Sequence, residues 1–195
     1  MESRLANTIE VFKTDLRWVA AVYDNEGLLS RLSFYNDSKK LALAAVEEFL
    51  TPCHGTLKGG SELQTELSRY AQGTPATFAK ISLSPCRTKF QTAVRQACRA
   101  VGYGKTATYG ELAHAAGSPK AARAVGLCMR NNPIPIVVPC HRIVGVGDRL
   151  IGFSAGPGIS LKMALLEMEG VKRKFVNRKG QLPLEELTMF DYVNG

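Results

Sequence analysis

Long apolar runs are missing from this sequence. Its longest apolar stretches, residues 41–46 and 134–138, are far too short to cross a bilayer. The first residues carry neither the apolar segment nor the cleavage-site pattern of a secretory signal. We therefore expect a protein without a membrane partner that works in the cytoplasm, or in the nucleus if the cell is eukaryotic.

Paired cysteines are missing as well. The five cysteines include no Cys-x-x-Cys pair and no regular disulfide framework, so we expect free thiols in a reducing compartment. A lone thiol is most often a small buried hydrophobe, and Cys98 fits that description on the apolar stripe of an expected helix. Cys53 stands beside His54, but no second pair completes a tetrahedral set of zinc ligands. We expect no metal and no cofactor.

Acidic residues are scarce in the second half of the chain. Residues 1–85 contain nine Lys/Arg and ten Asp/Glu, whereas residues 86–195 contain sixteen Lys/Arg and seven Asp/Glu. The net charge of +8 therefore comes entirely from the second half. Such asymmetry indicates a polyanionic partner for the C-terminal half, although basic composition alone is weak support for a nucleic acid.

The first 84 residues read as strands followed by a helix. Residues 19–23 and 28–35 are rich in apolar side chains and flank Asp24-Asn25-Glu26-Gly27, a turn signal of the hairpin type. Ser38 begins an expected helix that runs to Leu50. Two weaker segments follow: residues 56–73, which show little pattern, and residues 78–83, which could form one more strand. Nothing in this region resembles a catalytic site.

Three helices are expected after Ser84-Pro85. Thr88-x-x-Gln91 is a capping-box pattern that begins the first of them, and Gly102 and Gly104 end it. The next helix carries its apolar face on Tyr109, Leu112, Ala113 and Ala116. Gly117 can close it in the left-handed conformation, Ser118 can cap the third helix, and Pro119 suits its first position.

The third helix has an apolar face and a basic face. Ala122, Val125 and Met129 point to one side, and Lys120, Arg123, Leu127 and Arg130 to the other, with the small residues Ala121 and Ala124 between the cations. Two helices joined by a tight glycine turn, the second lined with cations, indicate a helix-turn-helix. A plain helical hairpin with a solvated basic face fits the pattern equally well.

The segment from Asn131 to Gly145 carries the chemistry. An apolar run interrupted by Pro135 and Pro139 delivers Cys140, His141 and Arg142 at its end. Because proline cannot donate a backbone hydrogen bond, we expect a rigid strap rather than a central strand. A thiol beside an imidazole and a guanidinium should have its thiolate favoured, and the thiolate is the nucleophile.

Several motifs together resemble the O6-alkylguanine-DNA alkyltransferase family. The resemblance covers about residues 85 to 170, more than two-fifths of the chain. It is carried by four stretches in the same order as in the family: Phe90-Gln91, Thr108 to Ala113, Pro119 to Gly126, and Asn132-Pro133 with Pro139-Cys140-His141-Arg142. The chain is therefore identified as a member of that family, and repair of DNA by irreversible, single-turnover transfer of an alkyl group from O6-alkylguanine, and from O4-alkylthymine, is expected.

The resemblance implies roles for five catalytic residues. Cys140 is the expected alkyl acceptor, His141 takes the thiol proton through a water molecule, and Glu169 orients the imidazole. Glu167 is the competing carboxylate, but its spacing from Lys162 and Gly170 fits less well. Tyr109 is expected to crowd the displaced phosphate and to reach the guanine ring, and Asn132 to tie the helix-turn-helix to the strap.

The resemblance also implies how DNA is bound. The partner is double-stranded DNA, entered through the minor groove by a monomer, with the damaged nucleotide flipped out of the stack. Arg123 fills the gap that the nucleotide leaves. The other expected DNA contacts are Tyr109, Lys120, Ala124 and Arg130, and the alkylguanine pocket consists of Cys140, Ile143, Phe153 and Ser154. Read without the resemblance, Arg123 would be a phosphate-binding arginine and Tyr109 a core aromatic.

Two departures from the family pattern are visible. In the pocket loop, this chain has Ala155-Gly156-Pro157-Gly158 where the family commonly has a glycine pair, and the loop as a whole is one residue longer. This departure leaves the range of accepted alkyl groups open. No N-terminal zinc set of the kind found in some members is present. Three alternative functions fit the sequence less well: a cysteine hydrolase, which would turn over; a helix-turn-helix regulator, which would not need the Cys-His-Arg strap; and a lesion sensor, which would lack the acceptor cysteine.

The predicted fold class is α/β in the broad sense (α+β). It combines a small N-terminal antiparallel-sheet domain bearing a helix with a mainly helical C-terminal domain that contains the helix-turn-helix and the active-site strap. The expected parts are residues 1–84, a structural α/β domain; residues 85–170, the catalytic and DNA-binding domain; and residues 171–195, a basic tail.

Overall fold

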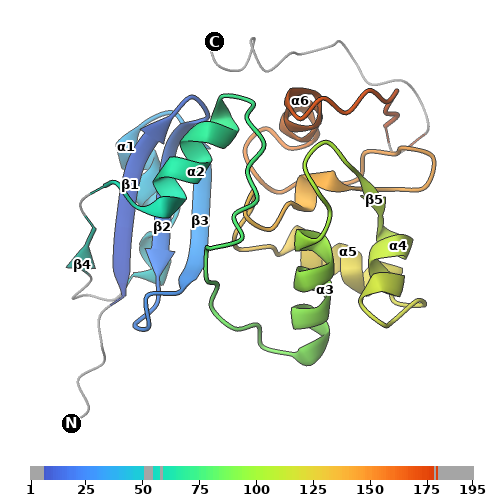
Figure 1. The fold of residues 1–195 in the computed structure, drawn as a ribbon, viewed down its shortest axis with the longest axis horizontal. Helices are drawn as coiled ribbons and strands as arrows, with labels where there is room; N and C mark the ends of the chain where they lie inside the picture. The colour runs from blue at the N-terminus through green and yellow to red at the C-terminus, as the bar shows by residue number, and fades with distance from the viewer. Residues whose placement is uncertain (1–6, 51–54, 58, 178, 180–195) are drawn as a thin grey trace. The chain divides into compact units, whose positions relative to one another are not determined.

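The computed structural model of the chain describes residues 7–50, 55–57, 59–177 and 179. The chain divides into two compact units, Met1–Pro85 and Cys86–Gly195 (Figure 1). The first is a sheet with helices and the second is mainly helical, which confirms the mixed α+β class. No helix within the described residues is long and apolar enough to span a membrane.

The first unit is built on a four-stranded sheet of order β3-β2-β1-β4. Strands β1 (Thr8–Thr14), β2 (Arg17–Tyr23) and β3 (Leu29–Asn36) pair antiparallel, and the two-residue β4 (Gly55–Thr56) runs parallel to β1. The predicted hairpin turn is confirmed: the Asp24 carboxylate accepts hydrogen bonds from the backbone N–H groups of Glu26 and Leu28. These bonds fix the register with which β2 meets β3.

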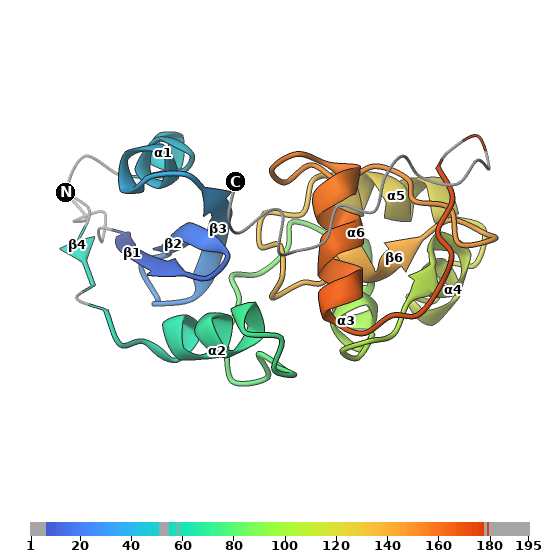
Figure 2. The same cartoon turned by 90° about the horizontal axis from the view of Figure 1, so that it is seen from above.

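The two faces of this sheet are covered by different helices (Figure 2). Helix α1 (Lys39–Ala44) begins at the predicted Ser38 cap but ends well before Leu50, and a 3-10 turn, η1 (Glu47–Phe49), follows it. Helix α2 (Glu62–Ala71) lies where the sequence showed little pattern. Its signals are the cap Ser61 and the buried positions Leu63, Leu67 and Tyr70, spaced as a helix requires.

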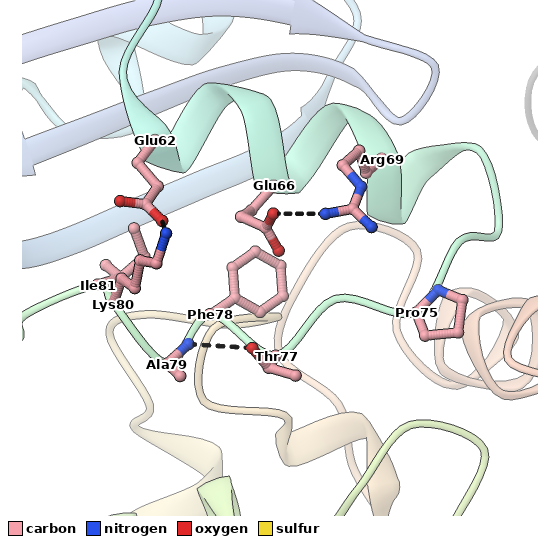
Figure 3. A pocket seen from close by; sticks show the side chains of 9 residues that line it. All are labelled: Glu62, Glu66, Arg69, Pro75, Thr77, Phe78, Ala79, Lys80 and Ile81. Atoms are coloured by element: carbon pink, nitrogen blue, oxygen red, sulfur yellow. Dashed lines mark hydrogen bonds and ion pairs between the residues drawn. The ribbon is translucent and has the colours of Figure 1, made fainter.

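The strand predicted over residues 78–83 does not form. Leu83 makes one isolated bridge to Leu29, and the rest of the segment is irregular. The reason is local: Phe78 has φ 50°, which breaks an extended run, and its carbonyl accepts a hydrogen bond from Ile81. Between this segment and α2 lies a hollow of about 220 Å³, walled by the Glu66–Arg69 ion pair and the ring of Phe78 (Figure 3).

The second unit contains four helices and two very short strands within its described residues. In chain order they are α3 (Lys89–Arg99), β5 (Ala107–Thr108), α4 (Tyr109–Ala115), α5 (Ala122–Arg130), the 3-10 turn η2 (Cys140–Arg142), β6 (Ile143–Val144) and α6 (Ile159–Met168). Strands β5 and β6 pair in parallel, which brings the start of α4 next to the residues after Cys140.

The joint between α4 and α5 differs in part from the prediction. Gly117 has the expected left-handed conformation, with φ 72°. Ser118 and Pro119, however, do not begin α5: a turn closed by the Ala121 N–H and the Ser118 carbonyl comes first, and α5 starts at Ala122 without a side-chain cap. The reciprocal capping box lies at α4, where Thr108 and Glu111 exchange hydrogen bonds.

The core of the second unit continues past Gly170, where the sequence analysis placed the start of a basic tail. Val171 and Phe175 are buried in a cluster with Val144, Leu150, Met163 and Leu166. The Leu150 N–H also donates to the carbonyl of Val176. Residues 171–177 therefore belong to the packed unit that supports η2 and α6.

Candidate active site

The segment that delivers Cys140 is compact, not an extended strap. The Val138 N–H donates to the carbonyl of Ile134, and Ile136 has φ 69°, so the chain turns back on itself between the prolines. Cys140 then begins η2, with its own N–H on the carbonyl of Val138. The prolines do keep the segment out of a sheet, as predicted, but they do so by closing a turn.

Asn132 joins this turn to the end of α5. Its amide nitrogen donates to the carbonyl of Val138 at 2.8 Å and to the sulfur of Cys140 at 3.1 Å. Its amide oxygen accepts from the N–H of Ile134 at 3.1 Å. One side chain therefore holds both ends of the turn and contacts the thiol directly, which places Asn132 where the sequence analysis expected it.

His141, Arg142 and Glu169 form a buried cluster behind the thiol. Glu169 is the C-cap of α6, and its Oε1 lies 2.7 Å from Nε2 of His141. Arg142 donates to both oxygens of the same carboxylate, at 2.9–3.2 Å, and to the carbonyl of Val101. Glu167, the competing carboxylate in the sequence analysis, is exposed.

The arginine of this cluster was not expected to bind Glu169. The sequence analysis assigned Arg142 to the thiol, but its guanidinium is committed to the carboxylate and to Val101, so it does not pair with Cys140. Nothing in the linear spacing could indicate that choice, because residues 142 and 169 meet only through the packing of α6.

Burial shapes the electrostatics of the site. It raises the pKa of the Cys140 thiol, while the hydrogen bond from Asn132 and the charge of Lys162 lower it. Burial also lowers the pKa of His141, against the raising effect of Glu169, so the imidazole is neutral at pH 7 and can take a proton. His141 and Arg142 overcome the burial of Glu169 and hold its pKa down at about 2. The expected preference for thiolate at rest is therefore opposed by desolvation.

Lys162 is the site residue that the sequence analysis missed. It lies on α6, is 0% exposed, and its amine donates to the carbonyl of Ile143. A lysine among Leu161, Met163 and Ala164 is a visible signal, because a charged residue in an otherwise apolar helix is rarely buried without a purpose.

The predicted pocket residues differ in exposure. Ile143 is fully buried, Phe153 is half-buried, and Ser154 is exposed with its hydroxyl on the carbonyl of Arg130. Tyr109, the first residue of α4, donates its hydroxyl to the carbonyl of Ile151 at 2.9 Å. Burial, followed by the nearby thiols, raises the pKa of Tyr109 to about 12, so this hydroxyl keeps its proton at neutral pH.

Helix α5 presents the predicted basic surface. Val125 and Met129 are buried, whereas Lys120, Arg123, Ala124, Leu127 and Arg130 are exposed. The same helix ends at Arg130, two residues before Asn132, so the exposed cations and the thiol are connected through a short piece of backbone. Four side chains of this surface, Lys120, Arg123, Ala124 and Arg130, are those expected to touch DNA.

The remaining thiols have no comparable surroundings. Cys98 is fully buried in α3, and burial raises its pKa well above the usual value. Cys128 is half-buried, and burial raises its pKa too. Cys53 and His54 lie outside the described residues. Among the residues that the structure describes, no group of three or more His, Cys, Asp or Glu side chains is arranged to hold a metal ion.

The structure brings a buried thiol and a histidine–carboxylate pair together at the end of the α4–α5 helix pair. The profile of a family described as "6-O-methylguanine DNA methyltransferase, DNA binding domain" matches residues 89–171. The chain is 44% identical over 131 residues to a methylated-DNA–protein-cysteine methyltransferase of Mycobacterium leprae, covering 67% of this chain and 72% of that one. It is 35% identical over 164 residues to that of Methanosarcina acetivorans, covering 82% and 96%.

A solved structure is similar over both units. A crystal structure of Mycobacterium tuberculosis OGT in complex with DNA aligns with a TM-score of 0.66 and 32% identity, covering 84% of this chain and 93% of that one. The chain belongs to the methylated-DNA–protein-cysteine methyltransferase family.

Proposed function

We propose that this protein repairs DNA by moving the alkyl group of O6-alkylguanine, and of O4-alkylthymine, onto its own Cys140. The names of its relatives support this activity. The observation that carries it is the thiol of Cys140, held at 3.1 Å by Asn132 and backed by the His141–Glu169 pair at 2.7 Å. No later step frees the sulfur, so each molecule reacts once.

The transfer is a displacement at the alkyl carbon. His141 takes the thiol proton through a water molecule, and the negative charge of Glu169 stabilises the imidazolium that results. The sulfur forms a bond to the alkyl carbon as the bond from that carbon to O6 breaks, and the electron pair stays on guanine. Guanine regains one proton, which the hydroxyl of Tyr109 helps to deliver. The products are a thioether and ordinary guanine, with no net change in protons.

DNA binding places the lesion at this thiol. The family membership and the basic surface of α5 support duplex DNA as the partner. In the proposed complex a monomer enters the minor groove with α5, where Ala124 permits close approach and Lys120 and Arg130 meet the backbone phosphates. The damaged nucleotide leaves the stack at a cost of a few kcal/mol, and Arg123 occupies its place. The first unit serves as a structural support.

Intact mass spectrometry after incubation with DNA containing O6-methylguanine tests the reaction. We expect one methyl group per protein, located by peptide mapping on Cys140, and no turnover. Cys140→Ala should abolish uptake completely while DNA affinity is retained, since the thiol supplies chemistry and little contact area. Cys86→Ser is the matched control and should keep full uptake. Methyl groups found on Cys98 or Cys128, or repeated turnover as in a cysteine hydrolase, would contradict the proposal.

Comparison of two substrates tests the role of Arg123. Arg123→Ala should slow repair of duplex DNA by about 10-fold to 100-fold, because losing about 1–3 kcal/mol of contact changes a rate by such factors. Reaction with free O6-benzylguanine, which needs no flipping, should be unchanged. Arg149→Ala removes an exposed arginine outside α5 and should affect neither reaction. Equal losses on both substrates would mean that Arg123 acts on the pocket or the fold.

A further inference from the structure

Lys162 buries a positive charge without an acidic partner. Its side chain is 0% exposed, and no carboxylate of the described residues forms an ion pair with it. Its amine donates to the backbone carbonyl of Ile143. Burying a charge is costly unless an opposite charge or several hydrogen bonds compensate it, so this position demands an explanation.

The amine is attached to the turn that carries the nucleophile. The Ile143 N–H donates to the carbonyl of Cys140, which closes η2, and the Ile143 carbonyl then accepts from Lys162. Glu169 lies seven residues further along the chain and holds His141. Seven residues are about two helical turns, so both side chains project from one face of α6. The segment from Lys162 to Glu169 therefore contacts η2 and its C-cap Ile143 at two points.

The charges of the site do not cancel while the thiol is protonated. Arg142 and Glu169 neutralise each other, and His141 is neutral. The titratable groups of the described residues that interact electrostatically with Lys162 are Cys140 and His141 on η2 and Cys98 on α3, whereas Arg142, also on η2, is paired with Glu169. Cys98 keeps its proton, since its pKa is raised well above the usual value. The anion that Lys162 lacks is thus the thiolate of Cys140.

We propose that Lys162 is a positioning residue of the transfer reaction, which fixes the turn from Cys140 to Ile143 and provides the counter-charge of the Cys140 thiolate. The inference rests on the proposed function and extends it. Lys162 offsets the desolvation that opposes thiolate formation, and burial in turn lowers its own pKa to about 8. The lysine exchanges no atom in the reaction: sulfur gains the alkyl group, guanine keeps the electron pair, and the thiol proton balances the one guanine gains. Once the thioether forms, Lys162 has lost its counter-ion.

Substitutions that separate charge from hydrogen bonding test the proposal. Lys162→Gln keeps a donor for the Ile143 carbonyl and loses the charge, Lys162→Arg keeps the charge, and Lys40→Gln is a control on an exposed lysine of α1. The rate of benzyl transfer from free O6-benzylguanine is measured against pH. We expect Lys162→Gln to raise the apparent pKa of the reaction by about one unit, hence about 10-fold slower transfer at neutral pH. Lys162→Arg should largely restore the profile.

The results that overturn the proposal differ from those that overturn the function. An unchanged pH profile in a folded Lys162→Gln protein, or equal slowing by Gln and Arg without a shift of the profile, defeats the role of Lys162. If the wild-type protein takes up no benzyl group, the proposed function fails instead. The role of Lys162 is then decided by ultraviolet titration of the thiolate, taken as the difference from Cys140→Ala, in which Lys162→Gln should shift the midpoint upward.

A measurement on the wild-type protein keeps the proposal testable even if the Lys162 variants do not fold. In protein labelled with heavy nitrogen at lysine, the side-chain resonance of Lys162 reports its protonation. Benzylation of Cys140 should lower the titration midpoint of this amine, because its counter-ion disappears. A midpoint that is the same before and after benzylation would overturn the proposal.

Discussion

Among the residues that the structure describes, each of the two units buries one carboxylate, and the two carboxylates have very different partners. Glu10, on β1 of the first unit, is 0% exposed and accepts hydrogen bonds from the hydroxyls of Tyr23 and Ser61 on a single oxygen. Within the described residues its other oxygen has no hydrogen-bond partner. Glu169, in the second unit, is bound by an imidazole and by a guanidinium that contacts both of its oxygens.

The difference distinguishes a carboxylate with a structural role from one with a proposed role in catalysis. Glu10 attaches α2 to the sheet, because it accepts a hydrogen bond from the hydroxyl of Ser61, the N-cap of that helix. This bond and the one from Tyr23 require an acceptor oxygen rather than a charge. At Glu169 the charge compensates Arg142, and in the proposed mechanism it also stabilises His141 when the imidazole takes a proton. A buried acid with cationic partners thus marks the unit that performs chemistry, and this contrast can be tested by removing each charge in turn.

Glu169→Gln should have the largest effect. It keeps the shape of the side chain but leaves Arg142 as an uncompensated buried charge, so we expect a loss of about 3–5 kcal/mol in the free energy of unfolding. Alkyl transfer at pH 7 should fall by about 100-fold or more, since the base loses its stabilising anion. Urea unfolding and the rate of benzyl transfer measure the two effects. Wild-type values for both would show that Glu169 is only a helix cap.

Acid should destabilise the second unit through the same carboxylate. The pKa of Glu169 is held at about 2, below its ordinary value, so its contribution is complete above that ordinary value and is lost as pH falls toward 2. The pKa of His141 is lowered as well, so stability also declines below about pH 6.5. Of the order of 3 kcal/mol should disappear between neutral and strongly acid pH. The free energy of unfolding should depend less on pH in Glu169→Gln than in the wild-type protein. The same pH dependence in both proteins would contradict the assignment.

Glu10→Gln should have the smallest effect. Its amide oxygen can still accept from Tyr23 and Ser61, and no described cation loses a partner, so stability should change by no more than about 1 kcal/mol. Benzyl transfer should proceed at the wild-type rate. Thermal melting and the transfer assay check both statements. A loss as large as that of Glu169→Gln would mean that the charge of Glu10 is needed, and the contrast between the units would be lost.

Local signals predicted much of this structure. The hairpin at Asp24–Gly27, the caps Ser38 and Thr88, and the left-handed Gly117 are decided by neighbouring residues, and sequence patterns identify them. Two predictions failed where the local backbone departs from the conformation that the side-chain pattern favours. The positive φ of Phe78 removes a strand, and the turn at 118–121 delays α5.

The candidate site shows the same division. The residues of the Pro-Cys-His-Arg motif were identified because they are adjacent in sequence, and Asn132 because Asn132-Pro133 is part of the family resemblance. The apolar neighbours of Lys162 on α6 indicate its burial, but the pairing of Arg142 with Glu169 depends on how α6 packs on η2, which no linear pattern contains. For the same reason, the sequence analysis did not predict that burial opposes formation of the Cys140 thiolate.

The interval between Lys162 and Glu169 on α6 limits how this chain can change length. A residue inserted between them would rotate one side chain by about 100° relative to the other and shift it by about 1.5 Å, so only one contact with η2 could persist. No such restriction applies before the helix, where the loop 155–158 departs from the glycine pair that the family resemblance implies. Length variation among relatives should therefore accumulate in the loops before Ile159 and be absent from the eight residues that link the amine to the carboxylate.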